Sequence, residues 1–498
     1  MIAGAFVLVF FTLQAQEAHN SGGCGYTGKS PWLAQYQYNR ETATTQRDLD
    51  TTWLYVPVTV HIVGKDNGSG YYPTQFAIRA ICEMNGQFEA SHIRFYFKPG
   101  DAFRFINNSA WYEHDWDGGS DMINGNRLPN RLNIFVVGDP AGNCGYSWQD
   151  AIVLGKNCSG SGNTTWAHEA GHHLSLPHPF YGWEGFDWNY NEPAPSQTNG
   201  HAVERKNGSN CNAAGDGFCD TPPDYLNFRW SCNGDFESTT LQTDPNGVTF
   251  RSDASIIMGY ALDACASRFS PEQIEAMRAN LYDEHSEYLQ INQPLADLPD
   301  DANVNLISPI DTQVTQYNDL TMSWNALPGA TFYTLEIGLF SNFVPTIYSQ
   351  TISTSVTSGM ISTHVAKVMP NNRVMYWRVH AYNNWDVCQP IGEFVYGVFK
   401  TQNLSATNEL EKVFAAELSP NPVASGLPAM LSISADQTMD ALLYVSDMAG
   451  KKCIEQNIRV AAGDNQLEIS TTGLQAGLYI VTLQNEKGLI VKRLSVSR

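Results

Sequence analysis

Apolar positions in the first half of the chain repeat at the spacings of strands and helices. In WLYVPVTVHIVG, Trp53–Gly64, apolar residues alternate with a period of two, which predicts a strand. Between Ile78 and Phe88 the apolar residues are three or four positions apart, which predicts one face of a helix. Further strands are predicted at IRFYFKPG, at RLNIFVVGD and at AIVLG. This order of strands around helices is typical of a mixed α/β domain.

Residues 181–250 interrupt this pattern with many Gly, Asn, Asp and Trp residues and little periodicity. A long irregular segment inside a domain usually lines a site or is held together by metals and disulfides. The cysteines in and just after this segment are Cys211, Cys219, Cys232 and Cys265. Disulfides are expected among them, with the pairing left open. Order resumes where Ser270, Pro271 and Gln273 predict the start of a helix.

Beyond residue 303 the pattern consists of short alternating strands separated by turn residues, as in LTMSWNALPGATFYTLEIG and NNRVMYWRVHAYN. This predicts one β-sandwich over residues 303–401 and a second strand-rich block over residues 410–498. The predicted fold class is therefore an α+β domain with a mixed sheet over residues 51–292, followed by two all-β sandwich domains.

The N-terminus has an apolar core from Ile2 to Leu13 that runs into small and polar residues. This predicts a signal peptide over residues 1–18, although no Lys or Arg precedes the core. A short buried strand or helix is the alternative. Residues 19–50 are polar and weakly patterned and are expected to form a pro-segment or linker. No later apolar run is long enough to span a membrane.

The charge balance narrows the class of partner. The chain of 498 residues has 29 Lys and Arg against 50 Asp and Glu, a formal net charge of −21. Phosphate backbones are bound by clustered Lys and Arg, so no nucleic-acid partner is expected. The length exceeds what one core usually holds, and the composition of 43% hydrophobic and 16% charged residues is that of a globular protein.

The segment TTWAHEAGHHLSLPHPF contains candidate metal ligands. If Thr164–Leu174 is helical, His168 and His172 are four residues apart and project from one face. Two imidazoles placed in this way can bind one Zn²⁺, whereas Glu169 is rotated by about 100° and reaches a water at the metal. Zinc lowers the pKa of that water toward about 7, and Glu169 would act as the general base toward a peptide carbonyl.

A third zinc ligand is expected at His178, six residues after His172. Pro177 cannot continue a helix and biases the residue before it toward extended backbone, which helps the chain to turn back toward the first two ligands. His173 points elsewhere by helical phase and is expected to pack rather than to bind metal.

HEAGHHLSLPH, with SIIMGYALDAC further along the chain, resembles the metzincin metallopeptidases. The resemblance implies that Met258 is the Met-turn residue, an apolar floor beneath the zinc site. It also implies that Tyr260 swings near the metal and stabilises the oxyanion of the transition state. Without the histidines, IIMGY would be interpreted as an ordinary core strand.

Within the metzincins, residues 53–285 most resemble the pappalysin family, through VPVTVHIVG, GDGFCDTPPDY and MGYALDACASRFSPEQIEAM. The resemblance implies a disulfide-stabilised region with a bound Ca²⁺. Its candidate ligands are Asp216, Asp220, Thr221 and the carbonyl of Phe218. Oxygen-only ligands suit Ca²⁺, while a solvated acidic turn is the alternative.

Two positions depart from the family pattern. Ser175 stands where the family has a glycine between the second and third histidines, and a positive φ there would cost Ser roughly 1 kcal/mol or more. We expect a local distortion rather than loss of zinc. Family members that prefer Arg or Lys after the scissile bond carry an acidic residue at the position of Ala264. Here that position is the neutral Ala264, and the acidic residue, Asp263, stands one position earlier. A preference for basic residues is therefore not predicted.

The N-terminal GGCGYTG resembles pappalysin pro-segments, in which a cysteine thiolate caps the catalytic zinc. The resemblance implies that Cys24 is a latency ligand, a soft thiolate in the coordination position that the water needs. The alternative is a disulfide between Cys24 and one of the other nine cysteines.

The two C-terminal blocks also have recognisable relatives. Residues 303–401 resemble a fibronectin type III-like module, in which Trp324 and Trp377 would be core residues rather than a ligand platform. Residues 410–498 resemble the C-terminal sorting domain of the bacterial type IX secretion system, through LSPNPV, LYVSDMAGKK and GLQAGLYIVTLQ. That resemblance implies a Bacteroidetes-type bacterium and export through the periplasm and outer membrane. A second β-sandwich with another role is the alternative.

Together these features predict a secreted metzincin-type zinc endopeptidase, with one catalytic Zn²⁺ and a structural Ca²⁺, that acts on protein or peptide substrates. The main rival is a non-catalytic surface adhesin whose metal site is structural or decayed. The retained Glu169 speaks against it, because a structural site needs no general base. A second rival is a zinc hydrolase that acts on glycan-linked amides.

Overall fold

The computed structural model describes residues 28–42, 51–298, 304–388, 395–402, 414–435, 437–448, 450–485 and 488–497. The predicted signal peptide, residues 1–18, and Cys24 lie outside these ranges. The helices are α1 (Pro31–Thr42), α2 (Thr74–Gln87), α3 (Ser109–Tyr112), α4 (Trp116–Asn126), α5 (Thr165–His173) and α6 (Pro271–Asp283). Single 3₁₀ turns are η1 (Glu89–Ser91), η2 (Lys156–Cys158), η3 (Cys211–Ala213) and η4 (Ser286–Tyr288). None of the helices in these ranges is long and apolar enough to cross a membrane.

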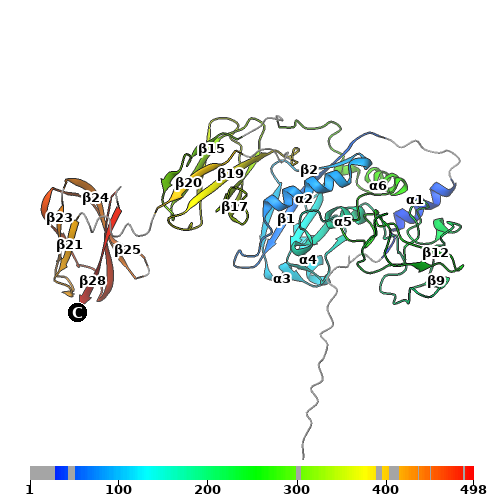
Figure 1. The fold of residues 1–498 in the computed structure, drawn as a ribbon, viewed down its shortest axis with the longest axis horizontal. Coiled ribbons are helices and arrows are strands. Elements are labelled where there is room, and N and C mark those ends of the chain that lie inside the picture. The colour runs from blue at the N-terminus through cyan, green and yellow to red at the C-terminus, as the bar shows by residue number, and fades with distance from the viewer. Residues whose placement is uncertain are drawn as a thin grey trace, which may run out of the picture.

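A six-stranded mixed sheet organises the first part of the chain (Figure 1). Its strands are β1 (Leu54–Gly64), β2 (Ile93–Phe97), β3 (Phe103–Asn107), β5 (Leu132–Val137), β7 (Gly145–Trp148) and β8 (Ala151–Gly155). β1 pairs in parallel with β2, β3 and β5, and β5 pairs in parallel with β8. β7 is antiparallel to β8 and is the last strand at that edge. The predicted mixed sheet is therefore confirmed.

The core of this part lies between the sheet and the helices. Every residue of β1 is buried, as expected for a central strand of a parallel sheet with both faces covered. Ile78, Ile81 and Met84 of α2 are buried in the same cluster, so the predicted helix face is confirmed. The predicted start of α6 is also confirmed, because Ser270 and Gln273 form a capping box.

Residues 181–250 contain little regular structure. Their strands have two residues each: β9 (Gln197–Thr198), β10 (His201–Ala202), β11 (Gln242–Thr243) and β12 (Thr249–Phe250). The irregular segment is held by the disulfides Cys211–Cys219 and Cys232–Cys265, which confirms the expected cross-links and supplies their pairing.

Outside this segment, the two short strands β4 (Glu113–His114) and β6 (Asp139–Pro140) pair with each other at the first sheet.

The second part is a β-sandwich. Its three-stranded sheet has the order β13 (Leu306–Ser308), β15 (Leu320–Asn325), β18 (Met360–Val365). Its five-stranded sheet has the order β14 (Gln313–Thr315), β20 (Gly397–Thr401), β19 (Val374–Tyr382), β16 (Phe332–Gly338), β17 (Thr346–Ser353). Trp324 from one sheet and Trp377 from the other are fully buried in one cluster, so their predicted place in the core is confirmed.

The sandwich is fastened to the first part by covalent and packing contacts. The disulfide Cys82–Cys388 joins α2 to the segment that follows β19. Trp385 is buried against Tyr55 and Tyr96 of the first sheet. The guanidinium of Arg94 lies 4.1 Å from the centroid of the Trp385 ring. This joint was not predicted from the sequence, because Cys82 and Cys388 are far apart along the chain.

The third part is another sandwich of three and five strands. The smaller sheet has the order β21 (Phe414–Ser419), β23 (Ala429–Ala435), β26 (Gly463–Ile469). The larger has the order β22 (Val423–Ala424), β28 (Gly488–Ser497), β27 (Gly477–Asn485), β24 (Met439–Asp447), β25 (Lys452–Val460). A separate apolar cluster fills it, so the expectation of two all-β sandwiches after an α+β part is confirmed.

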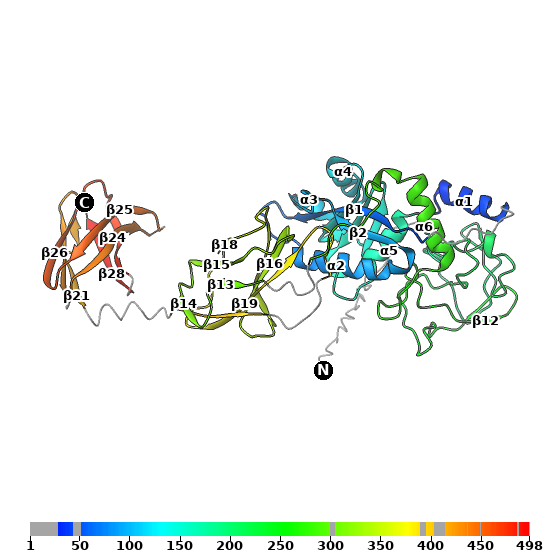
Figure 2. The same cartoon turned by 90° about the horizontal axis from the view of Figure 1, so that it is seen from above.

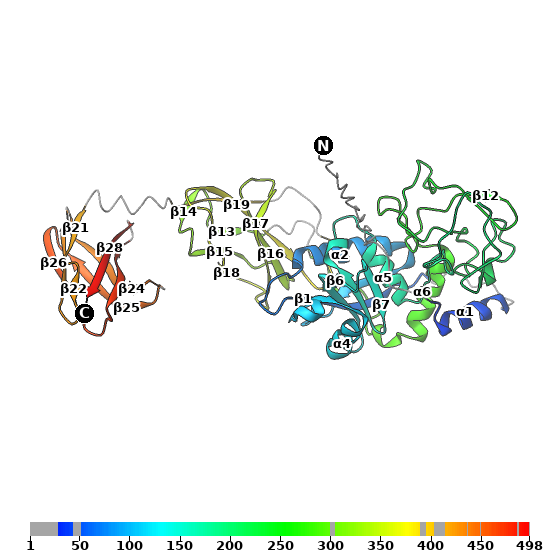
Figure 3. The same cartoon turned by 90° about the horizontal axis from the view of Figure 1, so that it is seen from below.

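α1 was not expected in the weakly patterned residues 19–50. The Oγ of Ser30 accepts a hydrogen bond from the Leu33 backbone N–H at 3.0 Å, and Pro31 occupies the first helical position. Leu33 is fully buried in the main core, and α1 lies beside α6 in two further views (Figure 2 and Figure 3). Packing against the rest of the protein therefore orders a segment whose own apolar pattern is weak.

Candidate metal centre

α5 carries two of the candidate ligands on one face. His168 and His172 are one turn apart on this helix and are 7% and 4% exposed. The helix packs beside β7 and β8 at the edge of the first sheet. The predicted i, i+4 arrangement is therefore present, and both imidazoles point into the protein.

The chain leaves α5 by a turn that returns His178 to the same place. Leu176 N–H donates to the Gly171 carbonyl and Ser175 N–H to the His172 carbonyl, both at 2.9 Å, which is the Schellman pattern of a helix C-terminus. Ser175 has φ 71°, so the position does require the left-handed conformation. Its Oγ accepts a hydrogen bond from Asn280 at 3.1 Å.

The three Nε2 atoms converge. His172 Nε2 lies 3.1 Å from His168 Nε2 and 3.1 Å from His178 Nε2. Two nitrogen ligands about 2.0–2.1 Å from one zinc ion in tetrahedral geometry are about 3.3 Å apart. Among the described residues, these histidines form the one group of three or more His, Cys, Asp or Glu whose ligand atoms could hold a metal ion.

The other nitrogen of each ring is directed at an oxygen. His168 Nδ1 lies 2.8 Å from the Ile257 carbonyl, and His172 Nδ1 lies 2.7 Å from the Leu176 carbonyl. His178 Nδ1 lies 3.3 Å from Glu184 Oε1. Each Nδ1 is therefore the protonated nitrogen, and the Nε2 lone pairs face one another. That tautomer binds a metal, and without a cation the lone pairs would repel.

Burial keeps these imidazoles neutral. It lowers the pKa of His168 to about 4 and lowers those of His172 and His178 well below the ordinary value. The neighbouring imidazoles add to the effect at His172 and His178. Neutral imidazole is the form that offers a lone pair to a metal.

Glu169 follows the first ligand directly and is 1% exposed. Its carboxylate lies against β7, because a Cβ atom added at Gly145 would be 2.8 Å from Glu169 Oε1. A buried carboxylate between a sheet edge and an imidazole cluster is in a position to exchange protons with a group bound there.

Met258 and Tyr260 pack around the histidines. Met258 is fully buried, and a Cβ atom added at Gly171 would be 2.5 Å from its Sδ, so the thioether lies directly beneath α5. The ring of Tyr260 is 5.0 Å from the ring of His178 and 6.1 Å from that of His168. Tyr260 therefore borders the centre, while Met258 supports it from below.

His173 lies away from the other three histidines. Its ring stacks on His285 at 4.6 Å, and its Nε2 lies 3.4 Å from the hydroxyl of Tyr288. It belongs to a separate buried group, in keeping with the packing role expected from its helical phase.

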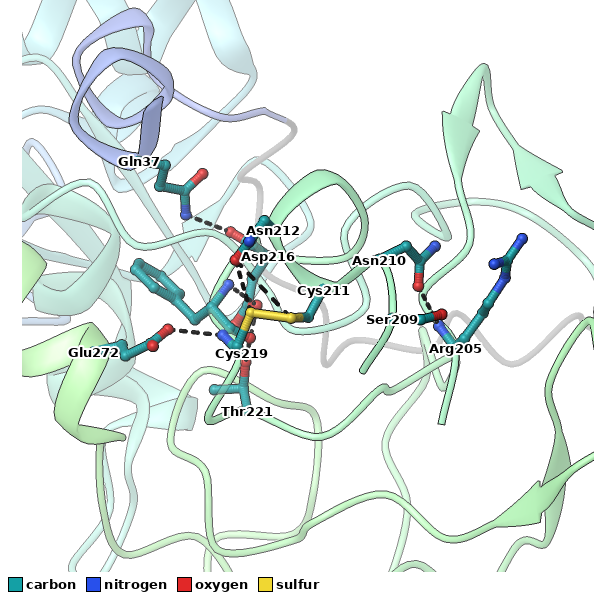
Figure 4. The surroundings of a disulfide bond; sticks show 12 residues. Gln37, Arg205, Ser209, Asn210, Cys211, Asn212, Asp216, Cys219, Thr221 and Glu272 are labelled. Carbon is teal, nitrogen blue, oxygen red and sulfur yellow. Dashed lines mark hydrogen bonds between the residues drawn. A yellow bond between two sulfur atoms is a disulfide. The ribbon is translucent and has the colours of Figure 1, made fainter. Parts of the chain in front are cut away.

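The predicted calcium residues divide into two sets. Asp216, Thr221 and the Phe218 carbonyl lie together, because Thr221 Oγ1 is 2.9 Å from each Asp216 carboxylate oxygen and 2.8 Å from that carbonyl (Figure 4). Asp220 instead caps α6, where it accepts hydrogen bonds from Ser270 Oγ at 2.7 Å and Glu272 N–H at 2.8 Å. The structure therefore does not direct the Asp220 carboxylate to that oxygen cluster.

Asp263, next to Ala264, is also occupied. Its carboxylate accepts hydrogen bonds from Thr164 N–H at 3.1 Å and Thr164 Oγ1 at 2.9 Å at the start of α5. It forms an ion pair with Arg229 at 3.0 Å. The acidic side chain nearest the position of Ala264 is thus already paired with a cationic side chain.

Three residues of the site escaped the sequence analysis. Glu184 holds the ring of His178, Gly145 leaves room for Glu169, and Glu204 is 4% exposed beside the calcium candidates. Glu184 and Glu204 both lie in the irregular segment 181–250. The sequence shows only that they are acidic residues of this segment, and the segment contains several other acidic residues that are exposed to solvent. Nothing in the sequence distinguishes the two from those residues.

The comparisons with known proteins identify the C-terminal part. Residues 417–497 match the family described as the secretion system C-terminal sorting domain. The protein is therefore handled by the type IX secretion machinery and is delivered to the cell surface or the extracellular space. This confirms the predicted sorting domain and the predicted location. No curated relative matches the chain.

Solved structures resemble the chain in part. A mutant of promirolysin from Tannerella forsythia is 18% identical, with a TM-score of 0.36 over 55% of this chain and 100% of that one. Domains FN1–FN3 of chicken CNTN1 are 15% identical, with a TM-score of 0.19 over 40% of this chain and 69% of that one.

Proposed function

We propose that the protein is a secreted zinc-dependent endopeptidase of the metzincin type, similar to the pappalysins, that hydrolyses peptide bonds in proteins. The observation that carries this proposal is the convergence of the Nε2 atoms of His168, His172 and His178 while each Nδ1 is held by an oxygen. The buried carboxylate of Glu169 beside them supports catalysis over the adhesin alternative, because a structural site needs no general base.

Each residue has a role in the proposed reaction. A Zn²⁺ ion held by the three imidazoles would lower the pKa of a water and polarise the scissile carbonyl. Glu169 would act as the general base that accepts a proton from the attacking water and as the general acid that passes it to the leaving amine nitrogen. The hydroxyl of Tyr260 donates a hydrogen bond to the carbonyl oxygen as negative charge develops on it. Met258 fixes the floor against which α5 rests.

The sheet edge beside Glu169 suits an extended substrate. β7 pairs with β8 on one side and ends the sheet on the other among the described residues. Exposed strand edges bind extended peptides through main-chain hydrogen bonds. A substrate added along β7 would pass Glu169 at Gly145. This favours internal peptide bonds of proteins over the glycan-linked amides of the second rival.

We assign the structural Ca²⁺ to Asp216, Thr221 and the Phe218 carbonyl, with Glu204 in place of Asp220. A hydroxyl has one proton, so Thr221 can donate to only one of the three oxygens within 2.9 Å of it. The remaining short contacts are between oxygen atoms that repel each other unless a bound cation lies among them. Such a set of carboxylate, hydroxyl and carbonyl oxygens fits Ca²⁺.

Cys24 remains our candidate for the latency ligand. Among the described residues, eight cysteines form four disulfides, and Cys453 is free and exposed in the sorting domain. The disulfide alternative for Cys24 is thereby narrowed to a bond with Cys453. A free Cys24 thiolate would compete with water for the fourth zinc position and keep the enzyme inactive until the N-terminal segment is removed.

The decisive experiment compares zinc content with proteolysis in the Cys24→Ala chain, so that latency cannot hide activity. Glu169→Gln should retain about one zinc per chain and lose casein cleavage by a factor of at least about 10³. Glu89→Gln, at an exposed glutamate of η1, is the control and should behave as the parent. If the parent binds zinc but cleaves neither casein nor peptidoglycan, the result would support the adhesin. If it cleaves peptidoglycan alone, the result would support the zinc hydrolase that acts on glycan-linked amides.

A further inference from the structure

The N-terminal helix makes specific contacts with the loop that carries the calcium candidates. Gln37 Nε2 of α1 donates a hydrogen bond to the Asp216 carbonyl at 2.9 Å (Figure 4). Arg40 forms an ion pair with Glu272 at 2.9 Å, and Trp32 Nε1 donates to Asp283 at 3.1 Å. A Cβ atom added at Gly217 would be 2.6 Å from the Gln37 amide. α1 is therefore seated on this loop and on α6.

Two carboxylates are buried beneath the seated segment. Asp216 is 1% exposed and Glu204 is 4% exposed. A Cβ atom added at Gly215 would be 2.5 Å from Glu204 Oε2 and 3.3 Å from the Pro179 carbonyl, so Glu204 and the residue after His178 both lie beside this loop. Within the described part of the chain, no group donates a hydrogen bond to the Glu204 carboxylate. Burial raises the pKa of Glu204 to about 9 and that of Asp216 to about 7, so a nearby cation is needed to keep both carboxylates ionised at neutral pH.

The chain has a cation of its own near these carboxylates, the ammonium of Lys29. Burial lowers the pKa of the Lys29 ammonium, while the charges of Asp216 and Glu204 act in the opposite direction and favour its charged form. The Nζ of Lys29 also lies 5.3 Å from the centroid of the Tyr181 ring, three residues after His178. Lys29 precedes α1 by two residues, so its ammonium stays near Asp216 and Glu204 only while the N-terminal segment is docked.

We propose that Lys29 and a divalent cation of the Ca²⁺ class compete for the buried carboxylates of Glu204 and Asp216, so that the N-terminal segment and the cation bind antagonistically. This inference rests on the proposed calcium site. One ammonium neutralises one of the two carboxylates, whereas a divalent cation neutralises both and also uses the Phe218 and Thr221 oxygens. The two cations beside the same buried carboxylates would repel each other strongly.

Because the two binding events are thermodynamically linked, the competition would also regulate docking of the N-terminal segment. If docking of Lys29 weakens the cation's affinity by some factor, the cation weakens docking of residues 28–42 by the same factor. Ser30, next to Lys29, donates from its Oγ to Ser175 Oγ at 3.2 Å, in the turn between the second and third zinc candidates. Release of Lys29 would therefore loosen a contact at the metal centre. Calcium would favour the state in which the N-terminal segment is open to proteolytic removal.

The test measures Ca²⁺ binding by calorimetry to the zinc-loaded full chain and to two variants. Lys29→Met should bind Ca²⁺ about 10-fold more tightly than the parent, because the competing charge is gone. Lys29→Arg keeps the charge and is the matched control, which should stay within about threefold of the parent. Hydrogen exchange of residues 31–42 should accelerate when Ca²⁺ is added to the parent and should change less in Lys29→Met.

The outcomes separate this inference from the proposals beneath it. Equal Ca²⁺ affinities of parent and Lys29→Met, or unchanged exchange of residues 31–42 on adding Ca²⁺, would overturn the competition and leave the calcium site standing. Absence of Ca²⁺ binding in all three chains would overturn the site and the competition together. Zinc content and casein cleavage, measured on the same samples, report separately on the peptidase.

Discussion

The Sδ atom of Met258 lies so close to the backbone of Gly171 that a Cβ atom at position 171 would be 2.5 Å away from it. Gly171 is in the middle of α5, between His168 and His172. The glycine thus allows the helix that carries two candidate ligands to rest directly on a buried thioether. Close contact of this kind transmits any change at Met258 to the spacing of the imidazoles.

Gly171→Ala is expected to destabilise the protein by about 1–3 kcal/mol, because the added methyl group overlaps Met258. The higher helix propensity of alanine offsets about 1 kcal/mol at most. Gly86→Ala, at an exposed position of α2 with no atom within 4 Å of the added Cβ, is the control and should not destabilise. Urea unfolding of the zinc-loaded chains measures both, and equal midpoints for Gly171→Ala and the parent would contradict the contact.

Glu184→Ala should weaken zinc binding by about 10- to 100-fold, because His178 Nδ1 loses the oxygen that fixes its tautomer and orientation. Glu184→Gln keeps an acceptor oxygen and should recover most of the affinity. Glu192→Ala, at an exposed glutamate of the same segment, is the control. Competition with a chromogenic zinc chelator measures the affinities. The role assigned to Glu184 fails if its alanine variant binds zinc as tightly as the control.

Tyr260→Phe should lower kcat by about 100-fold while zinc content and KM stay close to those of the parent, because the hydroxyl acts only on the developing oxyanion. Tyr181→Phe provides a matched loss of a hydroxyl near His178. Tyr181 is half-buried. The variant should change kcat by less than about twofold, since the lost hydroxyl has no role at the reacting atoms. Cleavage of a fluorogenic peptide under saturating conditions measures both, and a pure rise in KM for Tyr260→Phe would assign Tyr260 to substrate binding instead.

His61 predicts a loss of stability in acid. It is fully buried on β1, where burial lowers its pKa from 6.5 to about 4. The folded chain therefore keeps it neutral while the unfolded chain takes a proton, so its contribution is complete above pH 6.5 and decreases as the pH falls toward 4. The loss reaches about 3 kcal/mol at pH 4. Chemical denaturation of His61→Gln should show a shallower pH dependence between these values, and identical slopes would contradict the assignment.

Local rules were sufficient where neighbouring residues determine the geometry. The positions of His168 and His172 follow from helical spacing, and Pro177 with the turn at Ser175 returns His178 to them. The start of α6 follows from the pairing of Ser270 with Gln273. These features could be predicted because each depends on residues within a few positions of one another.

Tertiary contacts decide the rest. Glu184 became a partner of His178 only because the irregular segment folds over the site, and α1 formed because Leu33 found a place in the core. Asp220, expected near calcium, instead accepts hydrogen bonds from Ser270 and Glu272 at the N-terminus of α6, 50 and 52 positions away along the chain. Local sequence patterns do not predict such contacts, because the two residues that interact lie far apart along the chain.

The disulfide Cys82–Cys388 has a consequence for processing of the mature protein. It closes a ring of covalent bonds that spans 306 positions and contains the metal centre and most of the first sandwich. A single cut inside that ring, for instance between residues 298 and 304, opens it but releases neither part. A cut between residues 402 and 414 lies outside the ring and frees the sorting domain at once. Cleavage at the two junctions therefore has unequal results. A cut between residues 402 and 414 removes the sorting domain, whereas a cut between residues 298 and 304 leaves two chains that are joined covalently by the disulfide Cys82–Cys388.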